Sequence, residues 1–444
     1  MKYFGTDGIR GRAEMFTPEF VDSIAYAAAS NSSKIIIARD TRVSGERIEA
    51  LLADGLTRRG VNIVFAGIIP TPVLAYHTRI SGAQYGIMIT ASHNPSEYNG
   101  IKFFSPEGAK LTEDAERCLE SLINDYGSSK AEKRESCGHQ TDKRQQAAQA
   151  GIRELADAVS GYLQHIKCAL NPDIKGLRVL LDTANGAAAR VAPFMFSELG
   201  AQVSVINDEV NGRRINENCG AAYPDTLINA MAQGEYDIGF TYDGDGDRVM
   251  AVKDGKLLDG DRLLYAAARY FQERGMLRVA AAVGTVMTNL GAEQAFLRRG
   301  IRFIRASVGD KNVAMEMKKH NCCLGGEASG HLIFTDYQNT GDGLLSSILI
   351  AEIDKKRGLL ALDDIQEYPQ VSDDIITVPS KIVEFRNNKE IDGYLKTITK
   401  TPNLRTVVRV SGTEPRIRIM VEAPSRERAA HLAAEIKNYI LARI

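Results

Sequence analysis

The chain has 444 residues and a formal net charge of −1, from 55 Lys and Arg against 56 Asp and Glu. The length suggests about three domains, or four smaller ones. The balanced charge argues against a nucleic-acid partner, and no apolar run approaches the ~18 residues of a membrane span. Residues 1–5 contain no apolar stretch typical of a secretory signal, and no Cys-x-x-Cys occurs, so we expect a cytoplasmic protein without a zinc site or disulfides.

A repeated pattern of strand, helix, glycine and strand predicts α/β units. A buried strand at 34–38 is followed by a helix over 44–59, Gly60 and a strand at 61–65. The pattern recurs over 178–206 and over 279–305. Alternating strands and helices imply crossover connections and mainly parallel sheets covered on both faces. The predicted fold class is therefore α/β, with three similar units.

The end of the chain has a different pattern. Strands at 404–410 and 417–422 and a helix over 425–442 predict a smaller α+β unit. Between 127 and 150 every apolar side chain is Ala or Cys, which predicts a mobile surface spacer. The predicted domains are 1–150, 151–252, 253–365 and 366–444.

Four loops contain residues that could take part in catalysis or binding. The first is TASHNP at 90–95, directly after an apolar strand. In open α/β sheets ligands collect beyond the carboxyl ends of strands, which is where Ser92 and His93 fall. Pro95 keeps the preceding residue out of helical conformation, so the loop should present its serine. The alternative is a common hydrogen-bonded serine turn. No Gly-x-Ser-x-Gly elbow supports a hydrolase.

The second loop is DGDGDR at 243–248, which also follows an apolar strand. Asp243, Asp245 and Asp247 alternate with glycines and can bring their oxygens onto one hard cation, Mg²⁺ or Ca²⁺. Arg248 stands where an EF-hand needs glycine, which argues against calcium bound in that way. An acidic surface turn is the alternative, but clustered carboxylates repel one another without a cation.

The third and fourth loops offer polar groups suited to sugars and anions. GGEASGH at 325–331 presents Glu327, Ser329 and His331 beside glycines that permit close approach of a ligand. RVSGTEPR at 409–416 places two hydroxyls and a glycine between arginines, a combination that binds phosphate, although a hairpin with solvated arginines has the same pattern.

No nucleotide-binding loop accompanies this set. The only Gly-Lys pair, Gly255-Lys256, is followed by Leu257, so there is no Walker A motif. Asp254-Gly255 between two apolar runs instead predicts a hairpin turn. A serine, a cation loop and a phosphate loop without a nucleotide site indicate that the protein itself holds the phosphoryl group to be transferred.

The four loops, in this order, resemble those of the α-D-phosphohexomutase superfamily. Matching segments also include FGTDGIRG at 4–11, NGIKFF at 99–104, VGD at 308–310 and TGDG at 340–343, so the resemblance extends over nearly the whole chain. It implies three α/β domains and a smaller fourth domain around a central cleft. In order, the domains would carry the phosphoserine, metal, sugar and phosphate loops.

The resemblance also implies a reaction. Phosphorylated Ser92 would transfer its phosphoryl group to O1 of glucosamine 6-phosphate, and the 1,6-bisphosphate would reorient. Ser92 would then regain a phosphoryl group from O6 and release glucosamine 1-phosphate, which feeds synthesis of UDP-N-acetylglucosamine and cell-wall precursors. A sugar 1,6-bisphosphate would serve as activator.

The roles of individual residues follow from the same resemblance. The Mg²⁺ ligands would be Ser92, through its phosphate, and Asp243, Asp245 and Asp247. The catalytic group would comprise Ser92, His93, Arg10, Lys102 and Arg248, with Lys102 also a candidate for proton transfer. The substrate would be bound by Glu327, Ser329, His331, Arg409, Ser411, Gly412, Thr413 and Arg418.

One position departs from the pattern. Ala328 stands where members acting on glucosamine phosphate mostly have Gln, which leaves mutases of glucose or mannose phosphates as alternatives. Two further alternatives, which the residues favour less, are a phosphatase and a sugar-phosphate sensor without catalytic activity. The resemblance suggests a homodimer.

Overall fold

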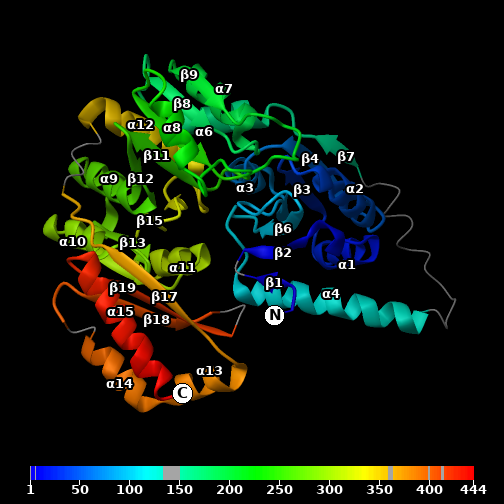
Figure 1. Cartoon of the computed structure of the whole chain (residues 1–444). Coiled ribbons are helices and arrows are strands. Elements are labelled where there is room, and N and C mark those ends of the chain that lie inside the picture. Colours follow the sequence, from blue (N-terminus) through cyan, green and yellow to red (C-terminus); the bar gives the residue numbers. More distant parts are fainter. Residues whose placement is uncertain (1, 6, 134–150, 359–363, 399–400, 412–414) are drawn as a thin grey trace.

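The computed structural model describes residues 2–5, 7–133, 151–358, 364–398, 401–411 and 415–444. Its helices and strands form four units that follow one another along the chain (Figure 1). Three have a mixed sheet covered by helices, and the fourth has a three-stranded antiparallel sheet. The predicted fold class, three similar α/β units and a smaller α+β unit, is confirmed.

The first unit contains a seven-stranded sheet in the order β1-β2-β6-β5-β3-β4-β7. Its central strands β4, β3 and β5 are parallel, and β6 and β2 continue the sheet in antiparallel fashion. The strands are β1 Phe4–Gly5, β2 Gly8–Arg12, β3 Lys34–Arg39, β4 Asn62–Ile68, β5 Tyr85–Ile89, β6 Tyr98–Phe104 and β7 Ile152–Glu154. The helices are α1 Pro18–Ala29, α2 Val43–Thr57, α3 Thr71–Ser81 and α4 Glu113–Lys133, with a 3₁₀ turn at Ala13–Met15.

The second unit contains a five-stranded sheet in the order β12-β11-β10-β8-β9. β10, β8 and β9 are parallel, whereas β11 and β12 return as a hairpin. Asp254 and Gly255 have φ of 48° and 72°, the left-handed turn conformation that joins two strands directly, so the predicted hairpin is confirmed. The elements are α6 Ala158–Leu170, β8 Arg178–Asp182, α7 Ala188–Glu198, β9 Gln202–Ile206, α8 Asp225–Met231, β10 Ile238–Tyr242, β11 Val249–Lys253 and β12 Lys256–Leu258.

The third unit contains a four-stranded sheet in the order β14-β13-β15-β16. β14, β13 and β15 are parallel, and β16 turns back against β15. The elements are α9 Gly260–Glu273, a 3₁₀ turn at Arg278–Ala280, β13 Ala281–Thr285, α10 Leu290–Arg298, β14 Arg302–Ala306, α11 Asp310–His320, β15 Leu324–Gly326, β16 Leu332–Phe334 and α12 Gly343–Arg357.

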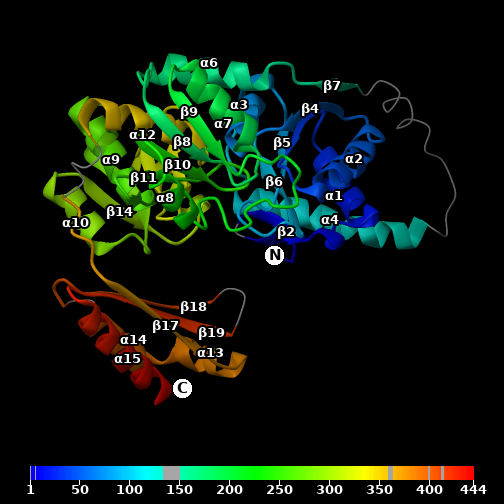
Figure 2. The ribbon, with the colours of Figure 1, turned by 45° about the horizontal axis from the view of Figure 1, so that its top comes forward.

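The fourth unit is an antiparallel sheet in the order β17-β19-β18 with helices packed on it. Figure 2 shows it below the other three units, and its Arg405 and Glu422 hydrogen-bond to Thr288 and Leu290 of the third unit. The elements are β17 Gln370–Ile376, α13 Pro379–Asn387, α14 Lys389–Ile398, β18 Arg405–Val410, β19 Arg416–Glu422 and α15 Arg426–Leu441.

One hydrophobic core joins the first three units. Successive residues of β3 point to opposite faces of the sheet, so Ile36 packs into this shared core while Ile35 and Ile37 pack beneath α1 and α2. Leu181 of the second unit and Leu264 of the third belong to the same shared core. The fourth unit has a separate core that includes Ile417.

The structure corrects parts of the predicted organisation. Residues 127–133, predicted to begin a mobile spacer, continue α4, and 134–150 lie outside the described residues. β7, placed in the second domain by the boundary at 150, pairs with β4 of the first sheet. The boundary at 252 divides the β11–β12 hairpin. Backbone pairing across the sheet fixes these assignments, and neither composition nor periodicity reports such pairing.

Removing a core side chain should destabilise the two parts of the molecule differently. Leu181→Ala and Ile417→Ala each empty a fully buried position and should cost about 2–5 kcal/mol. Hydrogen exchange should show lost protection throughout the first three units for Leu181→Ala, and only in the fourth unit for Ile417→Ala. Each variant is the control for the other, and equal loss across all four units in both would contradict the separate cores.

Candidate active site

Ser92 is fully buried in the loop after β5 and faces the second unit. Its Oγ donates a hydrogen bond of 2.6 Å to Asp243 Oδ2, and its backbone N–H donates to Thr90 Oγ1 at 2.8 Å. Ser92 has a φ of 52°, a left-handed conformation that residues with a side chain seldom adopt. The loop is therefore constrained, and it presents the hydroxyl to the aspartate loop.

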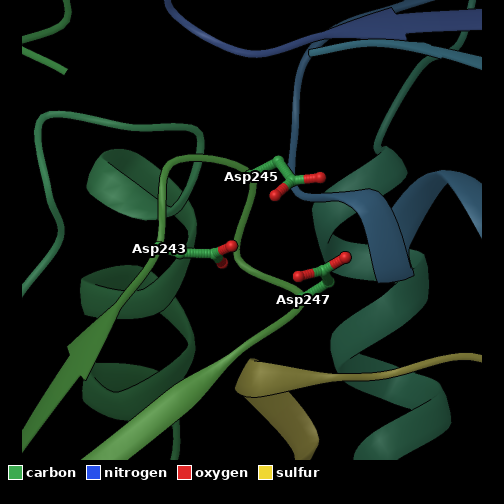
Figure 3. Close-up of side chains that lie close together, drawn as sticks. All are labelled: Asp243, Asp245 and Asp247. Atoms are coloured by element: carbon green, nitrogen blue, oxygen red, sulfur yellow. The ribbon is translucent and has the colours of Figure 1, made fainter. Parts of the chain in front are cut away.

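The three aspartates of the second loop converge between β10 and β11. One carboxylate oxygen from each of Asp243, Asp245 and Asp247 lies within 4.8 Å of the others, and all three side chains are buried. Figure 3 shows the three side chains close together at this loop. A Cβ added at Gly244 would lie 2.6 Å from the carbonyl oxygen of Ser92, so only glycine lets the two loops approach this closely.

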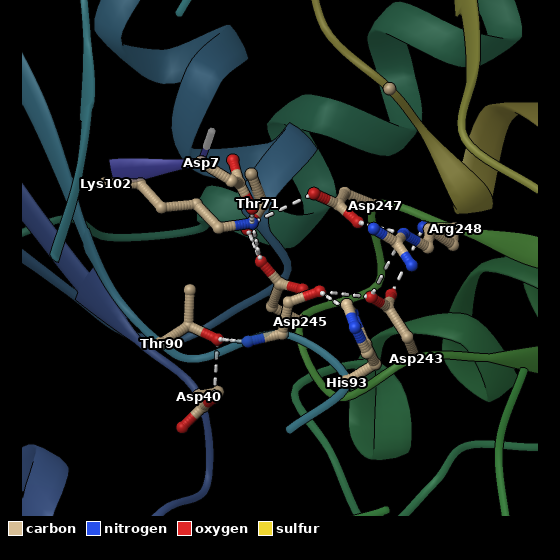
Figure 4. A network of polar contacts seen from close by, with 12 residues as sticks. Asp7, Asp40, Thr71, Thr90, His93, Lys102, Asp243, Asp245, Asp247 and Arg248 are labelled. Atoms are coloured by element: carbon tan, nitrogen blue, oxygen red, sulfur yellow. Dashed lines mark hydrogen bonds and ion pairs between the residues drawn. The ribbon is translucent and has the colours of Figure 1, made fainter. Parts of the chain in front are cut away.

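Cationic side chains partly compensate this buried negative charge. Lys102 Nζ, on β6, lies 2.8 Å from Asp245 Oδ2 and 3.0 Å from both Asp247 Oδ2 and Asp7 Oδ2 (Figure 4). Burial would lower the pKa of Lys102, but these three carboxylates raise it well above its usual value. Lys102 is therefore a fixed positive charge in this arrangement.

Arg248 approaches the aspartates from the opposite side. Its Nε lies 3.9 Å from Asp243 Oδ2 and 3.9 Å from Asp247 Oδ1. Burial would lower its pKa, but the two carboxylates outweigh burial and raise it. Arg10 pairs with Asp7 at the neighbouring wall.

The carboxylate set fits a divalent cation. Asp245 Oδ1 and Asp247 Oδ1 are buried and accept no hydrogen bond in the described part of the chain. Burial, followed by the charges of Asp247 and Asp245, raises the pKa of Asp243 to about 8. Oxygen ligands in a tight buried cluster are what Mg²⁺ prefers, and a cation would relieve their mutual repulsion.

A cavity of about 390 Å³ opens beside the aspartates and is lined by three units. The first unit contributes Arg10 and His93, and the second contributes Arg248. The third contributes the GGEASGH loop, in which the Glu327 carboxylate accepts the Gly309 N–H at 3.0 Å. Ser329, His331 and Ala328 also line the cavity.

Two histidines at the cavity have opposite electrostatic surroundings. Burial and the nearby guanidinium groups of Arg248 and Arg10 lower the pKa of His93 to about 4, so its ring is neutral. His331 Nε2 lies 3.3 Å from Asp310 Oδ2, and His331 Nδ1 lies 3.7 Å from Asp247 Oδ1. Burial would lower the pKa of His331, but these two carboxylates raise it. The cavity wall therefore offers one neutral imidazole and one that tends to be protonated.

The fourth loop does not meet the others in this structure. Arg409 on β18 and Arg418 on β19 are paired across the two strands. Ser411 directly follows the last residue of β18. Among the described residues, the cavity lining includes none from the fourth unit. Gly412 and Thr413 lie outside the described residues.

Several residues at the site were not identified from the sequence. Lys110 bonds to Asp7 and to Asp310, and so links the first and third units at the cavity wall. Thr71 donates to Asp245 Oδ2 at 2.5 Å. Asp7 and Asp310 belong to the FGTDGIRG and VGD segments, so the sequence offered a signal for both. Lys110 follows an ordinary turn sequence that gives no indication of a functional role.

The raised pKa of Asp243 gives a testable pH dependence. Its protonated form favours the folded state, because the same carboxyl in the unfolded chain loses its proton at a much lower pH, and this contribution disappears as pH rises through about 8. Mg²⁺ competes with that proton. The thermal stabilisation by Mg²⁺ of the unphosphorylated protein should therefore increase between about pH 6.5 and pH 9. Scanning fluorimetry measures it; Asp243→Asn is the control, and a constant Mg²⁺ effect would contradict the assignment.

Comparisons with known proteins agree with this architecture. Four models of the phosphoglucomutase/phosphomannomutase family match in order: alpha/beta/alpha domain I at residues 1–130, domain II at 160–256, domain III at 259–370 and the C-terminal domain at 380–438. A phosphoglucosamine mutase of Dictyoglomus thermophilum is 42% identical, over 99% of this chain and 96% of its own length.

Solved structures show the same fold. A phosphoglucomutase/phosphomannomutase family protein from Burkholderia thailandensis superposes with a TM-score of 0.80 at 25% identity, covering 98% of this chain and 96% of its own. Aspergillus fumigatus N-acetylphosphoglucosamine mutase, solved with GlcNAc-6P and magnesium, superposes with a TM-score of 0.68 at 19% identity, covering 98% and 95%. Because the family models cover all four units and the relative from Dictyoglomus thermophilum matches over nearly the full length of both chains, this chain belongs to the α-D-phosphohexomutase superfamily, in the phosphoglucomutase/phosphomannomutase family.

Proposed function

We propose that this protein is a phosphosugar mutase that interconverts glucosamine 6-phosphate and glucosamine 1-phosphate. The observation that supports it most directly is the 2.6 Å hydrogen bond from Ser92 Oγ to Asp243, within a buried carboxylate cluster beside a cavity lined by the sugar loop. The relative named phosphoglucosamine mutase, similar over nearly the full chain, points to the amino sugar.

In the proposed reaction Ser92 carries the phosphoryl group. The sugar hydroxyl oxygen forms a bond to phosphorus, the bond from phosphorus to Ser92 Oγ breaks, and Oγ takes up a proton as the hydroxyl loses one. His93 lines the cavity, is neutral, and has Nδ1 3.4 Å from Ser92 Oγ, so it is placed to relay that proton. The reverse step, from O6 of the bisphosphate, regenerates phosphorylated Ser92.

Charge stabilisation would come from Lys102, Arg248 and Arg10. Because phosphoryl transfer passes through a loose transition state, catalysis depends on positioning and on positive charge near the phosphoryl oxygens. The three carboxylate contacts of Lys102 favour this electrostatic role over proton transfer. Asp243, Asp245 and Asp247 would hold Mg²⁺ together with the Ser92 phosphate, and the bound ion would neutralise the transferring group.

The substrate would be bound by two units. We assign the sugar hydroxyls to Glu327 and Ser329, with His331 beside them, and the phosphate that does not react to Arg409, Ser411, Gly412, Thr413 and Arg418. Since the fourth unit has its own core and its described residues do not line the cavity, it would have to move toward the cavity when substrate binds. A sugar 1,6-bisphosphate would serve as activator.

The proposed function also carries expectations about the cellular location, the oligomeric state and the partners of the enzyme. No helix among the described residues is long and apolar enough to span a membrane. We propose a cytoplasmic enzyme, active as a homodimer, with phosphosugars rather than nucleic acid or lipid as its partners. Its four domains would divide near residues 150, 252 and 365, adjusted for the strand pairings described above.

Phosphorylation of Ser92 can be tested by intact-mass analysis together with a mutase assay. Wild-type protein should carry one phosphate, and Ser92→Ala should lack it and lose activity by about a thousandfold or more, because no other group takes up the phosphoryl. Ser96→Ala, in the same loop, is the matched control and should behave as wild type. Unphosphorylated protein that is fully active without a bisphosphate would refute the mechanism.

Substrate preference tests the amino-sugar assignment. The protein should have its highest kcat/KM with glucosamine 6-phosphate, compared with glucose and mannose 6-phosphates, because its overall similarity is to mutases of the amino sugar. Ala328 lines the cavity, so Ala328→Gln should change this preference without affecting Ser92 phosphorylation. A clear preference for mannose 6-phosphate, or sustained release of inorganic phosphate, would overturn the assignment.

A further inference from the structure

We propose that Arg42 and Asn216 form a carbonyl clamp, a pair of positioning residues from two units that fixes the Ser92 loop in the geometry needed for phosphoryl transfer. Neither residue lines the cavity, and neither was identified from the sequence as part of the site. The inference rests on the proposed role of Ser92 and adds the element that orients it.

Arg42 is the main hydrogen-bond donor to the backbone of the serine loop. Its side chain is fully buried, and Nη2 donates to the carbonyl oxygens of Ser92 at 2.9 Å and Asn94 at 2.7 Å. Nη1 donates to the carbonyls of Pro95 and Tyr98, the latter at 3.0 Å.

The remaining guanidinium donor is also used. Nε donates to Asp40 Oδ2 at 2.9 Å. All five N–H groups of the guanidinium thus have an acceptor. Three of those acceptors belong to the serine loop, and a fourth is Tyr98, the first residue of β6. Such a dense set around one buried cation exceeds what a stabilising ion pair with Asp40 requires.

Asn216 reaches the same loop from the second unit. Its Nδ2 donates to the carbonyl of Ser92 at 2.8 Å and to that of Asn94 at 3.0 Å, the two carbonyls that Arg42 Nη2 also contacts. Asn216 precedes the aspartate loop in sequence and packs against it, since a Cβ at Gly244 would lie 2.9 Å from Asn216 Nδ2. The clamp therefore ties the serine loop directly to the unit that supplies the aspartates.

The serine loop needs this support because its backbone is strained. Ser92 has a φ of 52°, which costs on the order of 1 kcal/mol or more for a residue with a side chain. Asp40 adds a further restraint through Thr90, whose Oγ1 donates to Asp40 and accepts the Ser92 N–H. Without the clamp, the loop could relax and move Oγ away from Asp243, and small misplacements of a reacting atom are costly.

The sharpest test is Asn216→Gly. Asn216 has a φ of 58°, which glycine adopts readily, so this variant removes the amide without straining the backbone. Asn218→Gly is the matched control, because Asn218 is an exposed asparagine of the same loop with a φ of 53°. Kinetics with glucosamine 6-phosphate, thermal midpoints, and Ser92 phosphorylation after incubation with glucose 1,6-bisphosphate are measured for both.

The clamp predicts that the two variants differ in kcat rather than in KM or folding. For Asn216→Gly, kcat should fall about tenfold to a hundredfold, with KM within about twofold of wild type. Its thermal midpoint should stay close to that of Asn218→Gly. Arg42→Lys, which keeps the charge for Asp40 but cannot reach four carbonyls, should lower kcat further wherever the protein remains folded.

Two outcomes would overturn the clamp. One is a kcat for Asn216→Gly equal to that of Asn218→Gly; the other is a loss of activity that only parallels a loss of folded protein. If wild-type protein does not convert glucosamine 6-phosphate, the proposed function fails separately. Phosphorylation of Ser92 by the bisphosphate still tests the clamp then, and equal rates of phosphorylation in both variants would refute it.

Discussion

The mutual repulsion of three buried carboxylates is the constraint on which the active site depends. Asp243, Asp245 and Asp247 are withdrawn from water and have oxygens within 4.8 Å of one another. Such a cluster is unfavourable unless positive charge is supplied. Lys102 supplies part of it from the first unit and Arg248 another part. The oxygens of Asp245 and Asp247 that accept no hydrogen bond among the described residues suit a divalent cation.

This requirement explains why the site lies where three units meet. One unit cannot place a lysine, three aspartates and a sugar loop around one point, because each parallel sheet presents its loops at a single edge. The shared core of the first three units brings three such edges together. Thr71, bonded to Asp245, and Lys110, bonded to Asp310, fasten the junctions at the site.

The fourth unit differs from the other three because it does not share their core. Its core is closed on itself, and its arginines lie on a small antiparallel sheet outside the cavity. A unit whose apolar core is separate from that of the others can move as a body at low energetic cost. A mutase that must accept its substrate in two orientations would benefit from that freedom, whereas the serine loop, clamped by Arg42 and Asn216, is rigid.

The sequence alone determined the local features of this protein. The strand, helix, glycine and strand predicted over 178–206 match β8, α7, Gly200 and β9, since side-chain periodicity and a helix-ending glycine specify such elements locally. DGDGDR likewise identified its carboxylate cluster, because neighbours in one loop are necessarily close in space. The family resemblance grouped Ser92, Lys102 and the aspartates into one expected site, but only the tertiary structure decided how these distant residues contact one another. The pairing of β7 with the first sheet, the neutral state of His93, the link through Lys110 and the contacts of Arg42 and Asn216 all depend on residues far apart in the chain. Their burial and charge arise only when the units pack together, so no local pattern in the sequence encodes them.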